Sequence, residues 1–178
     1  MTLLPLLVLA ALCLVTAGQA QDRASPVADA LRSHVQRAGR NLVAAADQMP
    51  ADKYGFKPTP AQMSFGDVIA HVAAGGDALC SSIAGVPAPK RTGSAASDSK
   101  EKLVARLRET FGFCESALAR VDDSRLDEKV PYFSAGEISR ADAMFATAEE
   151  LAGHYSQLAV YFRLSGLVPP TARGGGNQ

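Results

Sequence analysis

Apolar residues recur at alternating steps of three and four positions in four separate segments of the chain, which is the period of an amphipathic α-helix. The segments are residues 27–49, 64–83, 98–121 and 139–162. None of the sequence between them alternates in the way that predicts a β-strand. Each predicted helix has a single apolar stripe that it cannot bury alone, so the pattern predicts an all-α fold, a four-helix bundle.

Capping residues and helix breakers set the ends of these segments. A serine or aspartate followed three residues later by an acidic residue predicts a helix start. The pairs are Ser64 with Asp67, Asp98 with Glu101, and Ser139 with Asp142. Pro50 ends the first segment, and Gly166 fits the position just after the last one. The three connections are too long for tight turns, so a simple up-down topology is not required.

The pair Gly75 and Gly76 interrupts the second helical segment. Each glycine weakens a helix by roughly 1 kcal/mol relative to alanine. The pair indicates either close packing or local looseness at this point.

Composition narrows the classes of function. The chain has 178 residues and a formal net charge of zero. This length suits one domain, and the balanced charge gives no electrostatic reason to expect a nucleic-acid partner.

The first twenty residues differ from the rest. An apolar run from Leu3 to Val15 is followed by Gly18 and Ala20, small residues at the −3 and −1 positions of a signal-peptidase site. We therefore predict a secretory signal peptide at 1–20, a bundle domain at 21–170 and a disordered tail at 171–178. The mature protein would be secreted or periplasmic, with no stable membrane span. An uncleaved anchor or a wrongly chosen start codon is the alternative.

Cleavage would leave two cysteines, Cys80 and Cys114, each near an apolar stripe on a neighbouring helix. An oxidising compartment allows such a pair to form a disulfide, which would stabilise the fold by about 2–4 kcal/mol. Two buried, reduced thiols are the alternative.

Each of the three histidines lies one residue from a predicted core position. They are His34, His71 and His154. Glu150 lies four residues before His154, so both project from one face of the last helix. Together with His71 they form a set of two imidazoles and a carboxylate, which suits a divalent transition metal. Spacing alone equally allows hydrogen-bonded structural histidines.

Two segments resemble a known family. "MPADKYGFKPTPAQMSFGDVIAHVA" and "HYSQLAVYFRLSGLVPP" are similar to segments of the DinB-like, or YfiT-like, metalloenzyme superfamily. The resemblance runs from about Pro26 to Pro170. It implies a four-helix bundle with a long crossover connection, in agreement with the bundle predicted above.

The resemblance also implies a metal site. The family typically uses one histidine of the second helix and two spaced four apart on the last, which correspond here to His71, position 150 and His154. This chain departs at Glu150, which keeps a ligand-capable side chain and changes the charge of the site by −1. The expected cofactor is Zn, Ni, Fe or Mn. Ser156 replaces the glycine usual before Gln157, and His34 matches no ligand.

Two functions follow from the resemblance. One is a metal-dependent hydrolase or transferase acting on an unidentified small molecule, with unknown catalytic residues. Some relatives use low-molecular-weight thiols, which are mainly cytosolic, so export argues against thiol transfer here. The other is a non-catalytic metal-binding or structural bundle with a vestigial site. Both functions are compatible with a homodimer.

Overall fold

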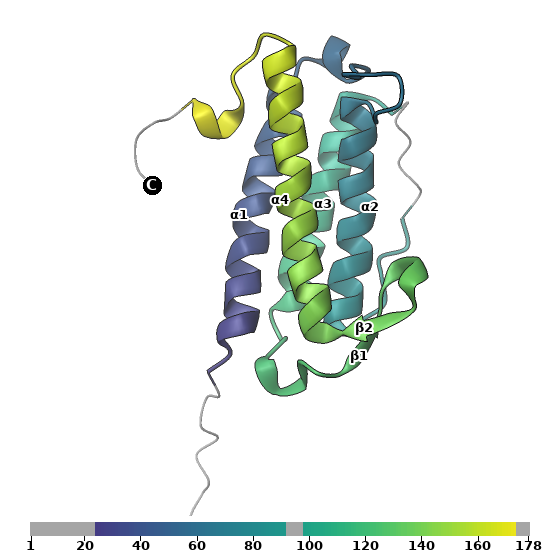
Figure 1. Ribbon diagram of the computed structural model, residues 1–178, viewed down its shortest axis with the longest axis vertical. Helices are drawn as coiled ribbons and strands as arrows, with labels where there is room; N and C mark the ends of the chain where they lie inside the picture. The colour runs from purple at the N-terminus through teal and green to yellow at the C-terminus, as the bar shows by residue number, and fades with distance from the viewer. Residues whose placement is uncertain (1–23, 92–97, 174–178) are drawn as a thin grey trace, which may run out of the picture.

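Four long helices make up most of the chain in the computed structural model, which describes residues 24–91 and 98–173. They are α1 (Pro26–Gln48), α2 (Phe65–Ala84), α3 (Lys100–Leu118) and α4 (Arg140–Leu164). Figure 1 shows them side by side as one bundle. The predicted all-α, four-helix fold is confirmed.

The predicted signal peptide lies outside the described residues, as do residues 174–178 of the predicted tail. Pro170–Ala172 forms a 3-10 turn, in which the Thr171 hydroxyl accepts from the Tyr155 hydroxyl at 2.8 Å. Within 24–91 and 98–173, no helix combines the length and apolar character needed to cross a membrane.

The helix starts follow the capping chemistry with one exception. At α2 the Ser64 hydroxyl accepts from the Asp67 amide at 3.1 Å, and the Asp67 carboxylate accepts from the Ser64 amide at 2.9 Å. The Ser64 hydroxyl also donates to the Asp67 carboxylate at 2.6 Å, and this bond, together with the one from the Ser64 amide, lowers the pKa of Asp67. The prediction that Asp98 caps α3 is wrong, because Ser99 is the N-cap and accepts from the Lys102 amide.

The helices do not follow a simple up-down order. α1 and α2 each pack against both α3 and α4. Gly76 of α2 lies next to Thr110 of α3, and Cys80, one turn later on α2, is bonded to Cys114, one turn later on α3. The two helices therefore run parallel. Parallel helices need a connection that returns over their whole length. The expected long crossover therefore lies between α2 and α3.

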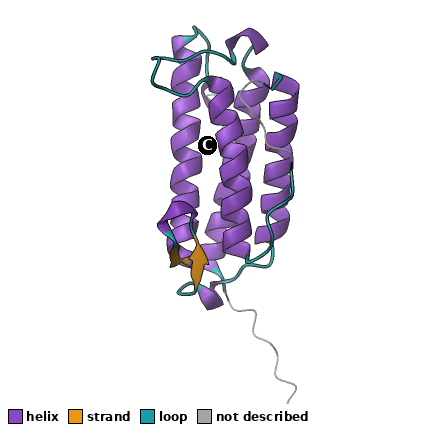
Figure 2. Ribbon diagram, turned by 90° about the vertical axis from the view of Figure 1, so that its right-hand side faces the viewer, coloured by secondary structure: helices purple, strands orange, loops and turns teal. Residues whose placement is uncertain are grey.

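A small β-hairpin covers the end of the bundle between α3 and α4. Strand β1 (Lys129–Pro131) pairs antiparallel with β2 (Glu137–Ser139), with Val130 opposite Ile138. Figure 2 shows the two strands at one end of the helices. The expectation of no strand is wrong here. Three-residue strands are too short to show an alternating pattern.

The two adjacent glycines of α2 have different environments. A Cβ at Gly76 would lie 2.7 Å from Cγ2 of Thr110, a fully buried residue of α3. A Cβ at Gly75 would meet nothing within 4 Å. Close packing therefore explains Gly76, whereas Gly75 borders open space. That space belongs to the cavity described below.

Candidate metal centre

The three predicted ligands come together on neighbouring helices. His71 comes from α2, while Glu150 and His154 come from successive turns of α4. One ligand atom of each residue lies within 4.8 Å of the others. The His71 and His154 rings meet edge to face, with centroids 4.8 Å apart. No other group of three or more such side chains gathers in this way within the described part of the chain.

Local helix structure explains this placement. The Ser64 cap fixes where α2 begins, and His71 follows in the second turn beside the buried Val72. On α4, Leu151 and Leu158 are buried in the core. Their burial turns Glu150 and His154 toward the groove between α4 and α2. The cap and the core stripe therefore determine which way the three side chains point.

A chain of hydrogen bonds fixes the His154 ring. The Tyr161 hydroxyl donates to the Met63 carbonyl at 2.8 Å, so its oxygen accepts from the Gln157 amide nitrogen at 3.1 Å. This orientation leaves the Gln157 amide oxygen facing Nδ1 of His154 at 3.2 Å. An amide oxygen only accepts, so Nδ1 must carry a proton. The free lone pair of a neutral His154 is then on Nε2.

That lone pair faces a carboxylate. Nε2 of His154 lies 3.1 Å from Oε2 of Glu150. A neutral imidazole protonated on Nδ1 and an ionised carboxylate would both present acceptors at this contact. The contact therefore needs either a proton or a metal ion between the two atoms. The donor set of His71, Glu150 and His154 fits a divalent transition metal.

His71 is the least constrained of the three residues. It is exposed, and no hydrogen bond to its ring is found among the described residues, in contrast to His154. Hydrogen bonds behind a metal-binding imidazole hold its orientation and raise its basicity. The α4 side of the site is thus preorganised, and the α2 side is free to adjust.

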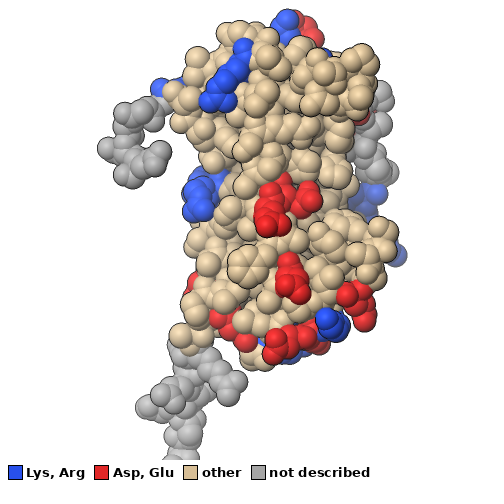
Figure 3. Space-filling view, in the orientation of Figure 1, with Lys and Arg blue, Asp and Glu red and all other residues tan. Residues whose placement is uncertain are grey.

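A cavity of about 220 Å³ adjoins the three residues. Its walls come from α2, α3, α4 and the hairpin segment at Tyr132 and Phe133. Figure 3 shows that the surface over α4 is mostly uncharged, with acidic side chains gathered over the middle of the helix. Among the described residues that line the cavity, Glu150 is the only carboxylate, and there is no lysine or arginine.

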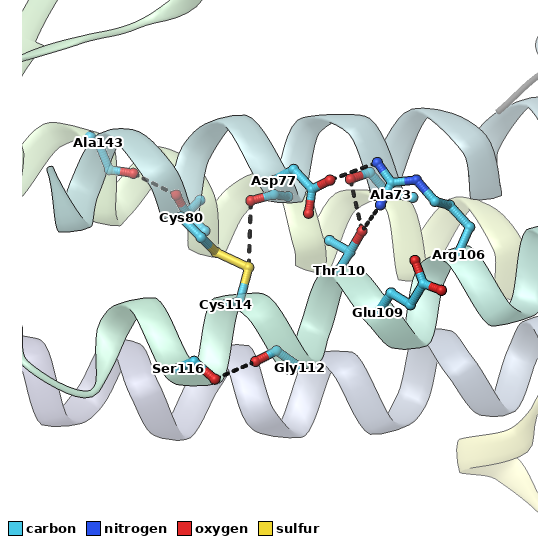
Figure 4. Close-up of a disulfide and its surroundings, with 12 residues drawn as sticks. Ala73, Asp77, Cys80, Arg106, Glu109, Thr110, Gly112, Cys114, Ser116 and Ala143 are labelled. Carbon is cyan, nitrogen blue, oxygen red and sulfur yellow. Dashed lines mark hydrogen bonds and ion pairs between the residues drawn. A yellow bond between two sulfur atoms is a disulfide. The ribbon is translucent and has the colours of Figure 1, made fainter. Parts of the chain in front are cut away.

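The two cysteines form part of the cavity wall. Cys80 and Cys114 are joined in a disulfide between α2 and α3, with Cα atoms 5.2 Å apart. Figure 4 shows this bond beside the buried Asp77, which accepts from Arg106 at 2.6 Å. The structure thus contains the predicted disulfide, and the alternative of two reduced thiols does not apply. Nothing in the spacing of these residues along the chain indicates that the disulfide and the histidines line the same cavity.

Several other polar residues that the structure describes are not part of this group of three. His34 is on α1, where its Nδ1 contacts the Arg37 guanidinium at 3.3 Å. Glu149 is exposed on α4 and Asp67 serves the α2 cap. Tyr161 is 1% exposed and acts through Gln157.

Sequence reasoning missed the part played by Gln157, Tyr132 and Phe133. The i, i+3 spacing of His154 and Gln157 was the available signal for the first of these. Nothing in the local pattern indicated that a hairpin would bring two aromatic residues to the site.

Comparisons with known proteins agree on the fold. The model of the DinB superfamily matches residues 34–158. The crystal structure of a DinB-like protein from Bacillus subtilis is similar at 18% identity and a TM-score of 0.62, covering 77% of this chain and 92% of that one. A conserved protein from Enterococcus faecalis is similar at 16% identity and a TM-score of 0.60, covering 79% of this chain and 98% of that one. No curated protein matches the sequence.

Proposed function

The chain belongs to the DinB superfamily, and on this premise we propose that it binds a divalent transition metal through His71, Glu150 and His154. We further propose that it is a metal-dependent hydrolase or transferase, acting on a small molecule held in the adjacent cavity. Export to an oxidising compartment is part of the proposal, because disulfides persist there.

One observation carries the metal proposal. The contact of 3.1 Å between Nε2 of His154 and Oε2 of Glu150 needs a proton or a metal ion between the two atoms, because the proton on Nδ1 already points to the Gln157 amide oxygen. The ring of His71 lies next to this contact and adds a third donor. A proton alone would satisfy the contact between His154 and Glu150, but it would not account for the position of the His71 ring beside them.

The number of donors favours a catalytic role. Structural zinc sites usually have four protein ligands, whereas catalytic sites have three and keep a position for water or substrate. His71, Glu150 and His154 are three, and they border a cavity. A metal bound there would act as a Lewis acid and lower the pKa of a coordinated water.

The protein's own groups have separate tasks in this proposal. Gln157 and Tyr161 hold the His154 ring so that Nε2 faces the site. Glu150 supplies negative charge, which offsets part of the charge of a divalent ion. The apolar walls of the cavity exclude bulk water from the bound substrate, which strengthens electrostatic interactions there.

Cobalt substitution tests both the site and its open position. The protein loaded with Co²⁺ should show ligand-field absorption bands that change when azide is added. His71→Ala and His154→Ala should lose these bands, and His34→Ala should keep them. Bands that do not respond to azide would indicate a closed, structural site. Absence of bands in the wild-type protein would remove the metal proposal.

A further inference from the structure

The cavity beside the three ligands has an almost entirely apolar lining. Val72, Leu79, Phe111 and Leu151 contribute aliphatic and aromatic walls, and the disulfide adds its sulfur atoms. The hydroxyl of Thr147, which also lines the cavity, already donates to the Ala143 carbonyl at 2.8 Å. Beyond the metal ligands themselves, these inner walls offer a bound molecule little hydrogen bonding.

Charge restricts the ligand further. The described residues that line the cavity include the Glu150 carboxylate and neither lysine nor arginine. A carboxylate, phosphate or sulfonate held in the apolar part of the cavity, away from the metal ion proposed above, would find no guanidinium or ammonium partner there. Burying a charge without a partner is costly. The lining therefore favours a molecule without negative charge.

Two aromatic residues close the outer side. Tyr132 and Phe133 lie with ring centroids 5.1 Å apart and planes at 67°. They belong to the segment between β1 and β2, which the Ser82 hydroxyl ties to α2 by donating to the Pro131 carbonyl. The aromatic pair is thus attached both to the hairpin and to the helix that carries His71.

Phe133 is unusual in two respects. Its side chain is 59% exposed although it is large and apolar. Its backbone has φ of +40°, a region that bulky residues rarely adopt. Such strained residues cluster at ligand clamps and active sites. An exposed, strained phenylalanine at the mouth of an apolar cavity is explained if its ring packs against a ligand.

The volume sets the size of that ligand. An apolar cavity of about 150 Å³ accommodates benzene. The cavity here measures about 220 Å³, which leaves room for a substituted single ring or a small bicyclic ring. Flat rings also suit the walls, because aromatic pairs gain from edge-to-face or offset stacking.

We propose that this cavity selects an uncharged aromatic molecule of one or two rings and holds it between Phe133 and the inner apolar wall. The proposal rests on the function proposed above, because it names the substrate class of the same site. The selecting residues are Phe133 and Tyr132 at the mouth and Gly75, whose missing side chain leaves the space open.

Indole is a suitable probe because the chain contains no tryptophan. Its fluorescence, excited where tyrosine does not absorb, should change in intensity and shift to shorter wavelength on entering the cavity. An indole sulfonate has the same ring with a permanent negative charge and is a poor metal ligand. We expect it to bind at least about tenfold more weakly than indole. Equal or tighter binding of the sulfonate would overturn the proposal.

Variants locate the binding. Gly75→Leu fills the cavity from α2 and should weaken indole binding by about tenfold or more. Gly153→Leu is the matched control, because a Cβ there also meets nothing within 4 Å and Gly153 does not line the cavity. Phe133→Ala should weaken binding by about three- to tenfold. Circular dichroism melts verify that each variant is folded.

The metal content of the same samples separates the two proposals. Indole binding that Gly75→Leu abolishes supports the apolar cavity even in metal-free protein, in which case the proposed function alone fails. Stoichiometric metal without indole binding would overturn the substrate class and leave the metal site standing. Indole binding unaffected by both Gly75→Leu and Phe133→Ala would also overturn it, because the ring would then bind elsewhere.

Discussion

Gln157→Leu should weaken metal binding although Gln157 is not a ligand. The substitution removes the amide oxygen that faces Nδ1 of His154 at 3.2 Å and the amide nitrogen that donates to Tyr161 at 3.1 Å. The His154 ring would then be free to rotate and to exchange its proton between the two nitrogens. Leucine keeps a similar length, so the packing around α4 changes little.

The structure sets the size of the effect. Loss of an outer hydrogen bond to a metal-binding histidine typically costs 10- to 100-fold in metal affinity. The His154 side chain is 18% exposed, so water can partly replace the lost acceptor. We therefore expect the lower end of that range, about tenfold, or ~1.4 kcal/mol.

Competition with a chromophoric zinc chelator at fixed pH measures the change. Gln36→Leu is the matched control, since Gln36 is exposed on α1 and lies away from the three ligands. Its zinc affinity should equal that of the wild-type protein. If Gln157→Leu also binds zinc within about twofold of wild type while remaining folded, the hydrogen-bond chain does not position His154.

Three further predictions concern stability. Gly76→Ala should lower the free energy of unfolding by about 1–3 kcal/mol, because its Cβ would meet a buried α3 side chain at 2.7 Å. Gly75→Ala should raise the free energy of unfolding by up to about 1 kcal/mol, because its Cβ would meet nothing within 4 Å. Thermal melts compare the two variants. Asp67→Ala should cost about 1 kcal/mol in urea unfolding at neutral pH. Replacing Cys80 and Cys114 by serine, or reducing them, should cost about 2–4 kcal/mol in urea.

The pH dependence of the capping contribution follows from the lowered pKa of Asp67. A lowered carboxyl pKa stabilises the folded state above the ordinary value of 3.8. This contribution is lost as pH falls through the lowered pKa. The difference in the free energy of unfolding between wild type and Asp67→Ala should therefore shrink in strong acid, and a constant difference would contradict the ionic cap.

Equal melting temperatures of Gly75→Ala and Gly76→Ala would contradict the packing described here. So would an unchanged stability after reduction of the disulfide.

The helices could be predicted because their signals are local. The stripe from Leu31 to Met49 and the caps at Ser64 and Ser139 depend on spacing along the chain, and the structure reproduces them. The pattern predicts the cap of α3 one residue early, at Asp98 in place of Ser99, because both are good capping residues. Only the folded backbone distinguishes them.

The site was predictable in part. Glu150 and His154 share a helix face, so their proximity follows from spacing alone, whereas His71 was joined to them by its place beside a predicted core position and by the resemblance to a family. The cavity could not be predicted, because it depends on contacts between distant segments. Phe133 reaches it through a hairpin of three-residue strands, and Gly75 opens it only because α2 turns that residue toward α4.

Elemental mass spectrometry of the protein purified without chelator tests the central claim most directly. Wild-type protein should carry close to one divalent transition metal ion per chain. His154→Ala should lose it and His34→Ala should retain it, since His34 lies apart from the three ligands. Metal-free wild-type protein, even after reconstitution with zinc, nickel, manganese and iron, would contradict the account and leave His71, Glu150 and His154 as a structural cluster.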